Sequence, residues 1–181
     1  MEVNFMKQLD HYETLEKMPK LNIDYVLFLC NVSCENLGLI LRSADIFGVN
    51  TVYYHHSNNT LNNKQLLKLS RNSNIPVYFS DGIDLLLRLK DSGYQIVALE
   101  ITNASIPLRF GHYTHKTCLV IGNEKNGIPE DILDVADYSC HIEMIGGHIS
   151  SLNVSIATSI ALYEISLYHL NNSSSEKHSL L

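Results

Sequence analysis

The stretch CENLGLILRSADIFGV, residues 34–49, directly follows a continuous apolar run, YVLFLC, at 25–30. Apolar residues recur in it at helical spacing, which predicts a helix with one face against a core: Leu37, Ile40, Leu41, Ala44 and Phe47. Gly38 lies inside that helix, although glycine costs about 1 kcal/mol there relative to alanine. Arg42 shares a second face with Gly38 and Asp45. The stretch therefore predicts a strand-to-helix unit whose helix has a second, chemically distinct face.

Strand and helix patterns continue to alternate along the chain. Further strands are expected at 51–55, 76–79, 95–101, 117–122 and 138–144. Helices are expected at 61–70, 82–90, 129–135 and 152–170. Because the strand patterns are apolar throughout, both faces of the sheet must be covered. The chain is predicted to be an α/β protein with a mostly parallel sheet and helices on both faces.

The 181 residues are the size of a single domain, which we expect to occupy residues 21–170. Before it, apolar residues at helical spacing over 3–18 predict a helix that ends at Pro19, within an N-terminal helical extension of residues 1–20. After it, the segment 171–181 is rich in Ser and Asn and is expected to be a disordered tail.

The charge of the chain limits how it can bind nucleic acid. The formal net charge of −6 argues against a protein that coats itself in nucleic acid, although it allows a local basic patch. Lys64, Lys68 and Arg71 form one stripe of the predicted helix 61–70 and are candidates for such a patch, with an ordinary solvated face as the alternative.

Location and metal content are also constrained. The sequence contains no run of about 18 apolar residues and no signal-peptide layout at its start, so a cytoplasmic protein without a membrane span is expected. The four cysteines include no C-x-x-C pair and are expected to be buried, reduced thiols. Cys and His do not cluster, so no metal site is predicted.

Three chemically unusual loops leave the carboxyl ends of predicted strands, which is where ligands bind in open sheets of this class. They span 32–36, 122–127 and 145–150. In the second loop, Gly122 and Gly127 allow backbone N–H groups to face a ligand, and Glu124 places a carboxylate between them. In the third, paired glycines precede a concentration of serine and asparagine.

Each loop also has an ordinary structural interpretation. Asn36 has the chemistry of a helix N-cap, and Ser151 and Asn153 are candidates to cap the last helix. Glu124 is also compatible with a solvated charge in a tight turn. His148 is a candidate acid or base, although a loop histidine is more often simply solvated. No G-x-G-x-x-G or P-loop fingerprint is present.

Together the three loops resemble the three motifs of the SPOUT superfamily of RNA methyltransferases, in its TrmH (SpoU) branch. Motif 1, N-x-G-x-x-x-R-x-x-x-x-x-G, is matched by Asn36, Gly38, Arg42 and Gly48. Motif 2, G-x-E-x-x-G, is matched by Gly122, Glu124 and Gly127. Motif 3 ends in S-L-N-V-S, which is matched by residues 151–155. The resemblance covers residues 24–168.

The chain departs from the family pattern in motif 3. Glu143 stands where the family's I-P-M has proline, and the segment from Met144 to Ser151 is one residue longer than usual.

The resemblance implies a deep C-terminal trefoil knot, a homodimer, and S-adenosylmethionine (AdoMet) bound by the knot loops. It also implies methyl transfer to a ribose 2′-hydroxyl of RNA, with tRNA expected ahead of rRNA because the chain is short. The cofactor-binding residues expected from it lie at strand ends and in motif 3: Leu99, Ile121, Gly122, Ile142, Met144, Ser151 and Leu152.

The resemblance also assigns catalytic roles. A guanidinium is a poor base because its pKa exceeds about 12. Arg42 is therefore expected to hold an RNA phosphate and stabilise the developing alkoxide. Asn36 is expected to orient Arg42 or the ribose. Glu124, Ser151 and Asn153 are expected to complete the catalytic pocket at or near the dimer interface.

Two other functions stay open. A non-catalytic RNA-binding paralogue agrees with the acidic net charge and the longer motif 3 loop. A SPOUT enzyme that methylates a base nitrogen would need a base in the closing loop, where only His148 is available.

Overall fold

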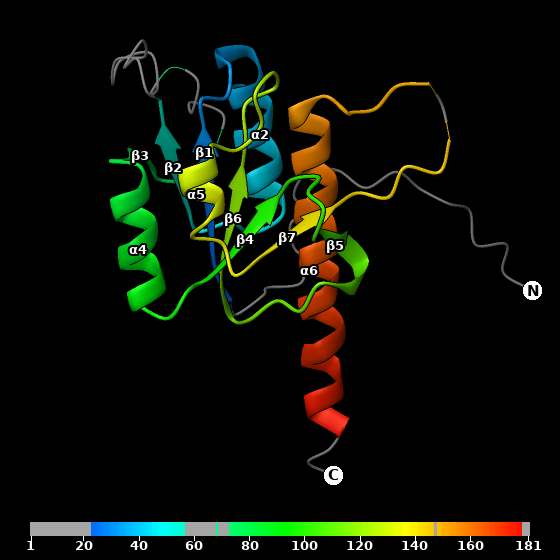
Figure 1. Cartoon of the computed structure of the whole chain (residues 1–181). Coiled ribbons are helices and arrows are strands. Elements are labelled where there is room, and N and C mark those ends of the chain that lie inside the picture. The colour runs from blue at the N-terminus through cyan, green and yellow to red at the C-terminus, as the bar shows by residue number, and fades with distance from the viewer. Residues whose placement is uncertain (1–22, 57–67, 69–72, 147, 179–181) are drawn as a thin grey trace, which may run out of the picture.

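The computed structural model describes residues 23–56, 68, 73–146 and 148–178. In this part of the chain, a sheet of parallel strands has the order β3-β2-β1-β6-β4-β7-β5 (Figure 1). The strands are β1 (Asp24–Cys30), β2 (Thr51–His55), β3 (Val77–Phe79), β4 (Gln95–Leu99), β5 (Ile106–Pro107), β6 (Lys116–Ile121) and β7 (Tyr138–His141). The helices are α2 (Cys34–Ile46), α4 (Ile83–Asp91), α5 (Glu130–Leu133) and α6 (Val154–His178), with a 3₁₀ turn η2 (Leu108–Phe110).

Helices cover both faces of the sheet, as β1 shows. Successive side chains of a strand point to opposite faces. Leu27 and Leu29 pack with α2 and α6, whereas Phe28 and Cys30 pack with α4 and α5. The continuous apolar run of β1 is therefore explained by two cores, and the predicted α/β fold is confirmed. The sheet is parallel throughout rather than mostly parallel.

Helix α2 begins at Cys34 with Ser33 as its N-cap, because the Ser33 hydroxyl accepts a hydrogen bond from Asn36 N at 3.4 Å. Asn36 is therefore free of the capping role that its residue type suggested. The predicted apolar face is buried at Leu37, Ile40, Leu41 and Ala44. The helix ends before Gly48, whose φ of +75° favours glycine.

The structure adds one strand to the six predicted ones. Strand β5 pairs with β7 over Ile106 and Pro107 only, which is too short to produce a periodic pattern. Strand β7 ends at His141, earlier than predicted. The predicted extension over 1–20 lies outside the described residues, and so does the helix at 61–70 except for its exposed residue Lys68.

The last helix is longer than the sequence indicated. We expected it to end at Leu170 and 171–181 to be a disordered tail, but α6 continues to His178. Its first half is held by packing at Ala161, Leu162 and Ile165. Once a helix is nucleated and packed, each further residue adds a hydrogen bond, so poor helix formers can extend it.

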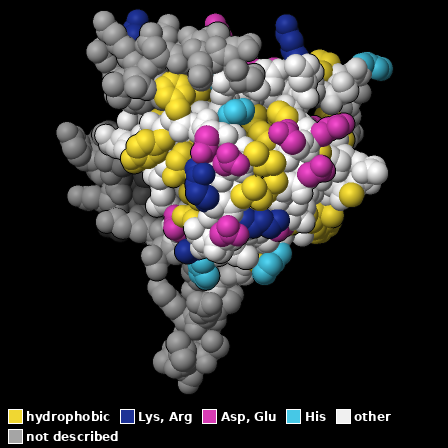
Figure 2. All heavy atoms as spheres, turned by 60° about the vertical axis from the view of Figure 1, so that its left-hand side comes forward, with side chains coloured by type: hydrophobic (Ala, Val, Ile, Leu, Met, Phe, Trp, Pro, Cys, Tyr) yellow, Lys and Arg dark blue, Asp and Glu magenta, His cyan; other side chains and the backbone are white. Residues whose placement is uncertain are grey.

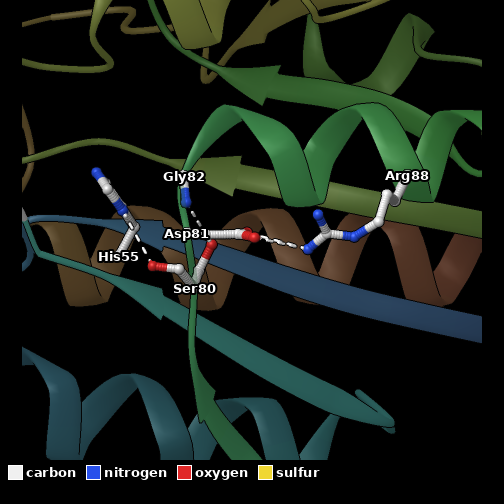
Figure 3. Close-up of polar contacts among 5 residues, drawn as sticks. All are labelled: His55, Ser80, Asp81, Gly82 and Arg88. Atoms are coloured by element: carbon white, nitrogen blue, oxygen red, sulfur yellow. Dashed lines mark hydrogen bonds and ion pairs between the residues drawn. The ribbon is translucent and has the colours of Figure 1, made fainter.

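The turn from β3 into α4 lies at the same carboxyl edge of the sheet as the candidate loops (Figure 3). Gly82 N donates to Ser80 Oγ at 3.0 Å, and Arg88 donates to both carboxylate oxygens of Asp81 at 2.9 and 3.1 Å. The hydrogen bond from Arg88 lowers the pKa of the Asp81 carboxyl. Gly82 has a φ of +78°, and a Cβ there would lie 3.0 Å from the His55 ring. This turn therefore requires glycine.

Leu27→Ala tests the core assignment. Leu27 is fully buried in the central part of the sheet, so we expect its truncation to lower the free energy of unfolding by about 2–5 kcal/mol. Leu87→Ala on α4 is the control, because Leu87 is 46% exposed and its truncation leaves no internal cavity. Urea denaturation followed by circular dichroism measures both. Equal midpoints for the two variants would contradict the assignment.

Candidate active site

The side-chain amide of Asn36 connects all three motif loops. Its Nδ2 donates to Ser33 Oγ at 3.1 Å and to Glu124 Oε1, in motif 2. Its Oδ1 accepts a hydrogen bond from Asn153 Nδ2, in motif 3, at 3.1 Å. Asn36 is buried on the first turn of α2, where an unpaired amide would be costly. Segments more than a hundred residues apart therefore meet at one amide group.

Backbone hydrogen bonds and glycine geometry shape the motif 2 loop. Asn123 and Gly127 exchange two backbone hydrogen bonds of 2.9 Å each, and Asn123 Nδ2 donates to Asn31 O at 2.6 Å. Gly127 has a φ of +67°. A Cβ on Gly122 would lie 2.3 Å from the carbonyl carbon of Gly127. Gly122 is thus required by close backbone approach within the loop itself, and Gly127 by its left-handed conformation.

Glu124 is held as a carboxylate. It accepts hydrogen bonds from Ser33 N at 3.3 Å, from Asn123 Nδ2 at 3.2 Å and from Asn36 Nδ2. Partial burial acts to raise the pKa of the Glu124 carboxyl, but hydrogen bonds from its own backbone N–H, Asn36 and Ser33 outweigh that effect and the pKa is lowered. This contribution to stability is present above the ordinary glutamate pKa and is lost as the pH falls through the lowered value.

Motif 3 enters helix α6 through Asn153. Asn153 Oδ1 accepts hydrogen bonds from Ser155 N at 2.9 Å and Ser155 Oγ at 2.6 Å, so of the two candidate caps Asn153 fills the role. Its Nδ2 remains available for Asn36. Ser151 is exposed and lines a neighbouring cavity instead.

The cavity has a volume of about 360 Å³ and lies at the carboxyl ends of β4, β6 and β7. This volume is within the usual range for small-molecule sites, roughly 300–1,000 Å³. All seven residues predicted to bind the cofactor line it: Leu99, Ile121, Gly122, Ile142, Met144, Ser151 and Leu152. Glu124 lines it as well. The structure thus brings the predicted cofactor residues into one concave site.

Arg42 lies apart from this cavity. It is exposed on α2, it is not among the cavity-lining residues, and it makes no hydrogen bond or ion pair with the described residues. His148 is also exposed. Lys68 is exposed, while Lys64 and Arg71 lie outside the described residues. Of the residues expected to bind RNA, the two that the structure describes, Arg42 and Lys68, therefore do not line the cavity that the expected cofactor residues form.

Several other basic side chains are paired with carboxylates. On α4, Arg88 bonds to Asp81 and Lys90 to Asp137, each at 2.9 Å. Figure 2 shows basic, acidic and hydrophobic side chains interspersed on the side of the molecule that carries α4. Such a mixed surface is a poor match for the continuous negative charge of an RNA backbone.

The SpoU rRNA methylase family model matches residues 24–163 of the chain. The chain belongs to this family. A tRNA (guanosine(18)-2′-O)-methyltransferase of Aquifex aeolicus (strain VF5) is 37% identical over 155 residues, which cover 84% of this chain and 72% of that protein. The chain spans little more than half the length of several further curated relatives that it matches.

Solved structures of the family have the same fold. A crystal structure of the A. aeolicus TrmH/SpoU tRNA modifying enzyme superimposes with a TM-score of 0.74 at 33% identity, over 85% of this chain and 79% of that one. An AdoMet-bound rRNA methyltransferase from Sinorhizobium meliloti superimposes with a TM-score of 0.70 at 25% identity, over 86% of this chain and 59% of that one.

Glu100 lines the cavity of this SpoU family member, although the sequence patterns did not predict it. Its carboxylate accepts hydrogen bonds from Ile101 N and Ile128 N, each at 3.0 Å, and so joins the end of β4 to the motif 2 loop. The available signal was a charged residue at the end of the apolar run QIVALE, where a strand reaches the ligand edge. Asn123, Lys125 and His141 line the cavity and were missed too.

The four cysteines are free thiols. Cys30, Cys118 and Cys140 are buried as predicted, and burial raises the pKa of Cys140 to about 12. Cys34 is exposed, contrary to the prediction, because it starts α2 on the solvent side. Among the described residues, we find no group of three or more potential metal ligands and no helix long and apolar enough to cross a membrane.

Asn36→Asp tests the connection between the motif loops. The substitution removes the donor to Glu124 and places two carboxylates together, so we expect the free energy of unfolding at pH 7 to fall by about 2 kcal/mol. Lowering the pH to about 5 should recover part of this loss, because protonation of one carboxyl restores a donor.

Urea denaturation at both pH values measures this effect. Asn126→Asp is the control, because Asn126 is exposed on the same loop and only its backbone N–H bonds to Asn123. If the two variants were equally stable at pH 7, the amide of Asn36 would not hold the loops together.

Proposed function

We propose that this protein transfers the methyl group of AdoMet to a ribose 2′-hydroxyl of RNA, and that the RNA is tRNA rather than rRNA. The observation that carries the proposal is the Asn36 amide, which gathers the three family motifs beside a cavity lined by every residue expected to bind the cofactor. The relatives named for tRNA 2′-O-methylation support the choice of reaction and substrate.

The cavity fits AdoMet. Leu99, Ile121 and Ile142 provide apolar walls at strand ends, suited to an adenine ring, while Glu100 and Ser151 add polar groups. AdoMet supplies an already activated methyl group, so the protein has to hold it and present the ribose hydroxyl in line. The fixed motif 2 loop and the capped start of α6 provide a rigid frame for this.

Arg42 and Asn36 have different roles in this proposal. The exposed Arg42 holds an RNA phosphate and stabilises the alkoxide that forms at the 2′-oxygen. The amide of Asn36 is fully engaged by Ser33, Glu124 and Asn153, so Asn36 positions the loops rather than contacting the ribose. Glu124 and Ser151 complete the pocket around the methyl group, and Asn153, which does not line the cavity, supports it through Asn36 and the start of α6.

A homodimer would bring Arg42 to a cavity. Helices α2 and α6 pack side by side, joined by the Ser43–Ser159 hydroxyl pair at 2.7 Å. On either side of that joint, exposed apolar residues occupy the same stripe of each helix: Leu39 and Ile46 on α2, Ile156 and Tyr163 on α6. Because this apolar surface carries Arg42 between Leu39 and Ile46, a second copy docked there would meet Arg42 directly.

The proposal includes the C-terminal trefoil knot and a cytoplasmic location. Strand β7 lies between β4 and β5, both earlier in the sequence. The chain thus returns to the interior of the sheet before α6, and this placement, together with membership of the family, supports the proposed knot. A tRNA substrate supports a cytoplasmic enzyme.

Arg42→Ala tests the reaction. With labelled AdoMet and total tRNA, we expect wild type to yield 2′-O-methylated nucleosides and Arg42→Ala to be slower by about 100-fold or more, because the alkoxide loses its cation. AdoMet affinity should change little, because Arg42 is proposed to contact the RNA phosphate and the 2′-oxygen rather than the cofactor, and it does not line the cavity of its own chain. The matched control is Arg88→Ala, since Arg88 is paired with Asp81 on the distant helix α4.

Nuclease digestion and mass spectrometry of the nucleosides locate the methyl group. A methyl group on a base would favour the base-methylating alternative. Transfer to rRNA alone would overturn the choice of tRNA. Absence of transfer to either RNA, with equal RNA binding by wild type and Arg42→Ala, would favour the non-catalytic paralogue.

A second prediction concerns the dimer. Leu39→Glu combined with Ile156→Glu buries charge in the proposed interface, so we expect the molar mass to fall from that of a dimer to that of a monomer. Light scattering after size exclusion measures it. Leu87→Glu, at a comparably exposed position on α4, should leave the dimer intact. A monomeric wild type would contradict the proposal.

A further inference from the structure

His141 is a cavity residue to which none of the three motifs assigns a role. It ends β7 at the carboxyl edge of the sheet, where its backbone pairs with Pro107 of β5. Its half-buried side chain lines the cavity together with Ile142 and Met144. The strand register therefore fixes an imidazole in the wall of the site proposed for AdoMet.

The hydrogen bonds of Ser105 favour one tautomer of the His141 ring. Ser105 Oγ donates to Thr102 O at 3.0 Å and accepts from Thr102 N at 3.1 Å. Its third contact is with His141 Nδ1 at 2.9 Å. A hydroxyl has one proton and two acceptor sites. A carbonyl can only accept, so when the Ser105 proton is donated to Thr102 O, the third contact requires Nδ1–H to donate.

This arrangement leaves Nε2 of the neutral ring as a hydrogen-bond acceptor. Nε2 makes no hydrogen bond with the described residues. The supporting loop is itself fixed, because Thr102 Oγ1 accepts from Ala104 N at 3.2 Å and contacts Ser139 Oγ at 2.8 Å. Ser139 and His141 lie two residues apart on β7, on the same face of the strand. The imidazole is thus oriented before any ligand binds.

We propose that His141 Nε2 accepts a hydrogen bond from a donor of the adenosine part of the cofactor, either the exocyclic amine of adenine or a ribose hydroxyl. This inference rests on the proposed function, because it assumes that the cavity holds AdoMet. His141 then selects an adenosine ligand over one that presents an acceptor at the same place, since two facing acceptors would leave both unpaired. Ser105 is a positioning residue that holds the required tautomer.

Calorimetric titration with S-adenosylhomocysteine, the reaction product, tests the proposal without RNA or turnover. We expect His141→Phe, which keeps a ring of similar size, to bind it about fivefold or more weakly. His141→Gln should recover much of the affinity, because its longer amide can place an acceptor near the position of Nε2. His141→Asn should not, because its amide reaches only the position of Nδ1. Ser105→Ala should weaken binding to an intermediate extent.

Analogues separate the two donors. The inosine analogue replaces the exocyclic amine by a carbonyl, and the deoxy analogues remove one ribose hydroxyl each. Wild type should bind the analogue that lacks the contacted donor more weakly than S-adenosylhomocysteine. His141→Phe should bind these two ligands equally well, while its discrimination among the other analogues stays as in wild type. Unchanged affinity of His141→Phe for S-adenosylhomocysteine would overturn the proposal. The proposal would also fail if His141→Phe bound S-adenosylhomocysteine and every analogue more weakly by the same factor, because His141 would then contribute packing only. A wild type that binds no S-adenosylhomocysteine would overturn the proposed function instead. Thermal unfolding checks that all variants are folded.

Discussion

The candidate site depends on one buried amide. Asn36 can satisfy its donor and acceptor only if the motif 2 carboxylate and the motif 3 asparagine are both in place. A buried polar group without partners is costly, so the sheet and helices that bring these loops together also determine where the cavity forms. Ser33 strengthens the arrangement, because its backbone N–H bonds to Glu124 while its hydroxyl caps α2. Ser33 therefore serves both the start of α2 and the candidate site.

The parallel sheet explains why these loops meet at all. In a parallel sheet, every strand delivers its following loop to the same edge. Strands β1, β6 and β4 are neighbours, so the loop with Asn36, the loop with Glu124 and the carboxylate of Glu100 are adjacent without any long excursion of the chain. Close backbone packing between Gly122 and Gly127 then lets the motif 2 loop fold back on itself.

Many of the strands, helices and site residues could be predicted from the sequence. The ones that could not be predicted depend on packing and on contacts between distant parts of the chain. The strands β1 and β6 and the buried face of α2 followed from apolar periodicity, since burial on both faces leaves continuous apolar runs. The family resemblance at strand ends predicted a group of residues for the cofactor, and all of them line one cavity. Periodicity could not reveal β5, which has two residues, or the extension of α6 beyond Leu170, which depends on packing earlier in the helix. Glu100 and His141 were missed because their roles arise from partners distant in sequence.

Because Arg42 lies apart from the cavity of its own chain, the cation and the cofactor site need to be brought together for the proposed reaction. Arg42 lies on an exposed helix face beside apolar residues, whereas Glu124 and Ser151 lie at the cavity. If Arg42 comes from a second copy, one chain supplies the cofactor cavity and its partner supplies the cation that faces the ribose. In such a dimer, Gly38, one turn before Arg42 on the same helix face, places no side chain beside the guanidinium.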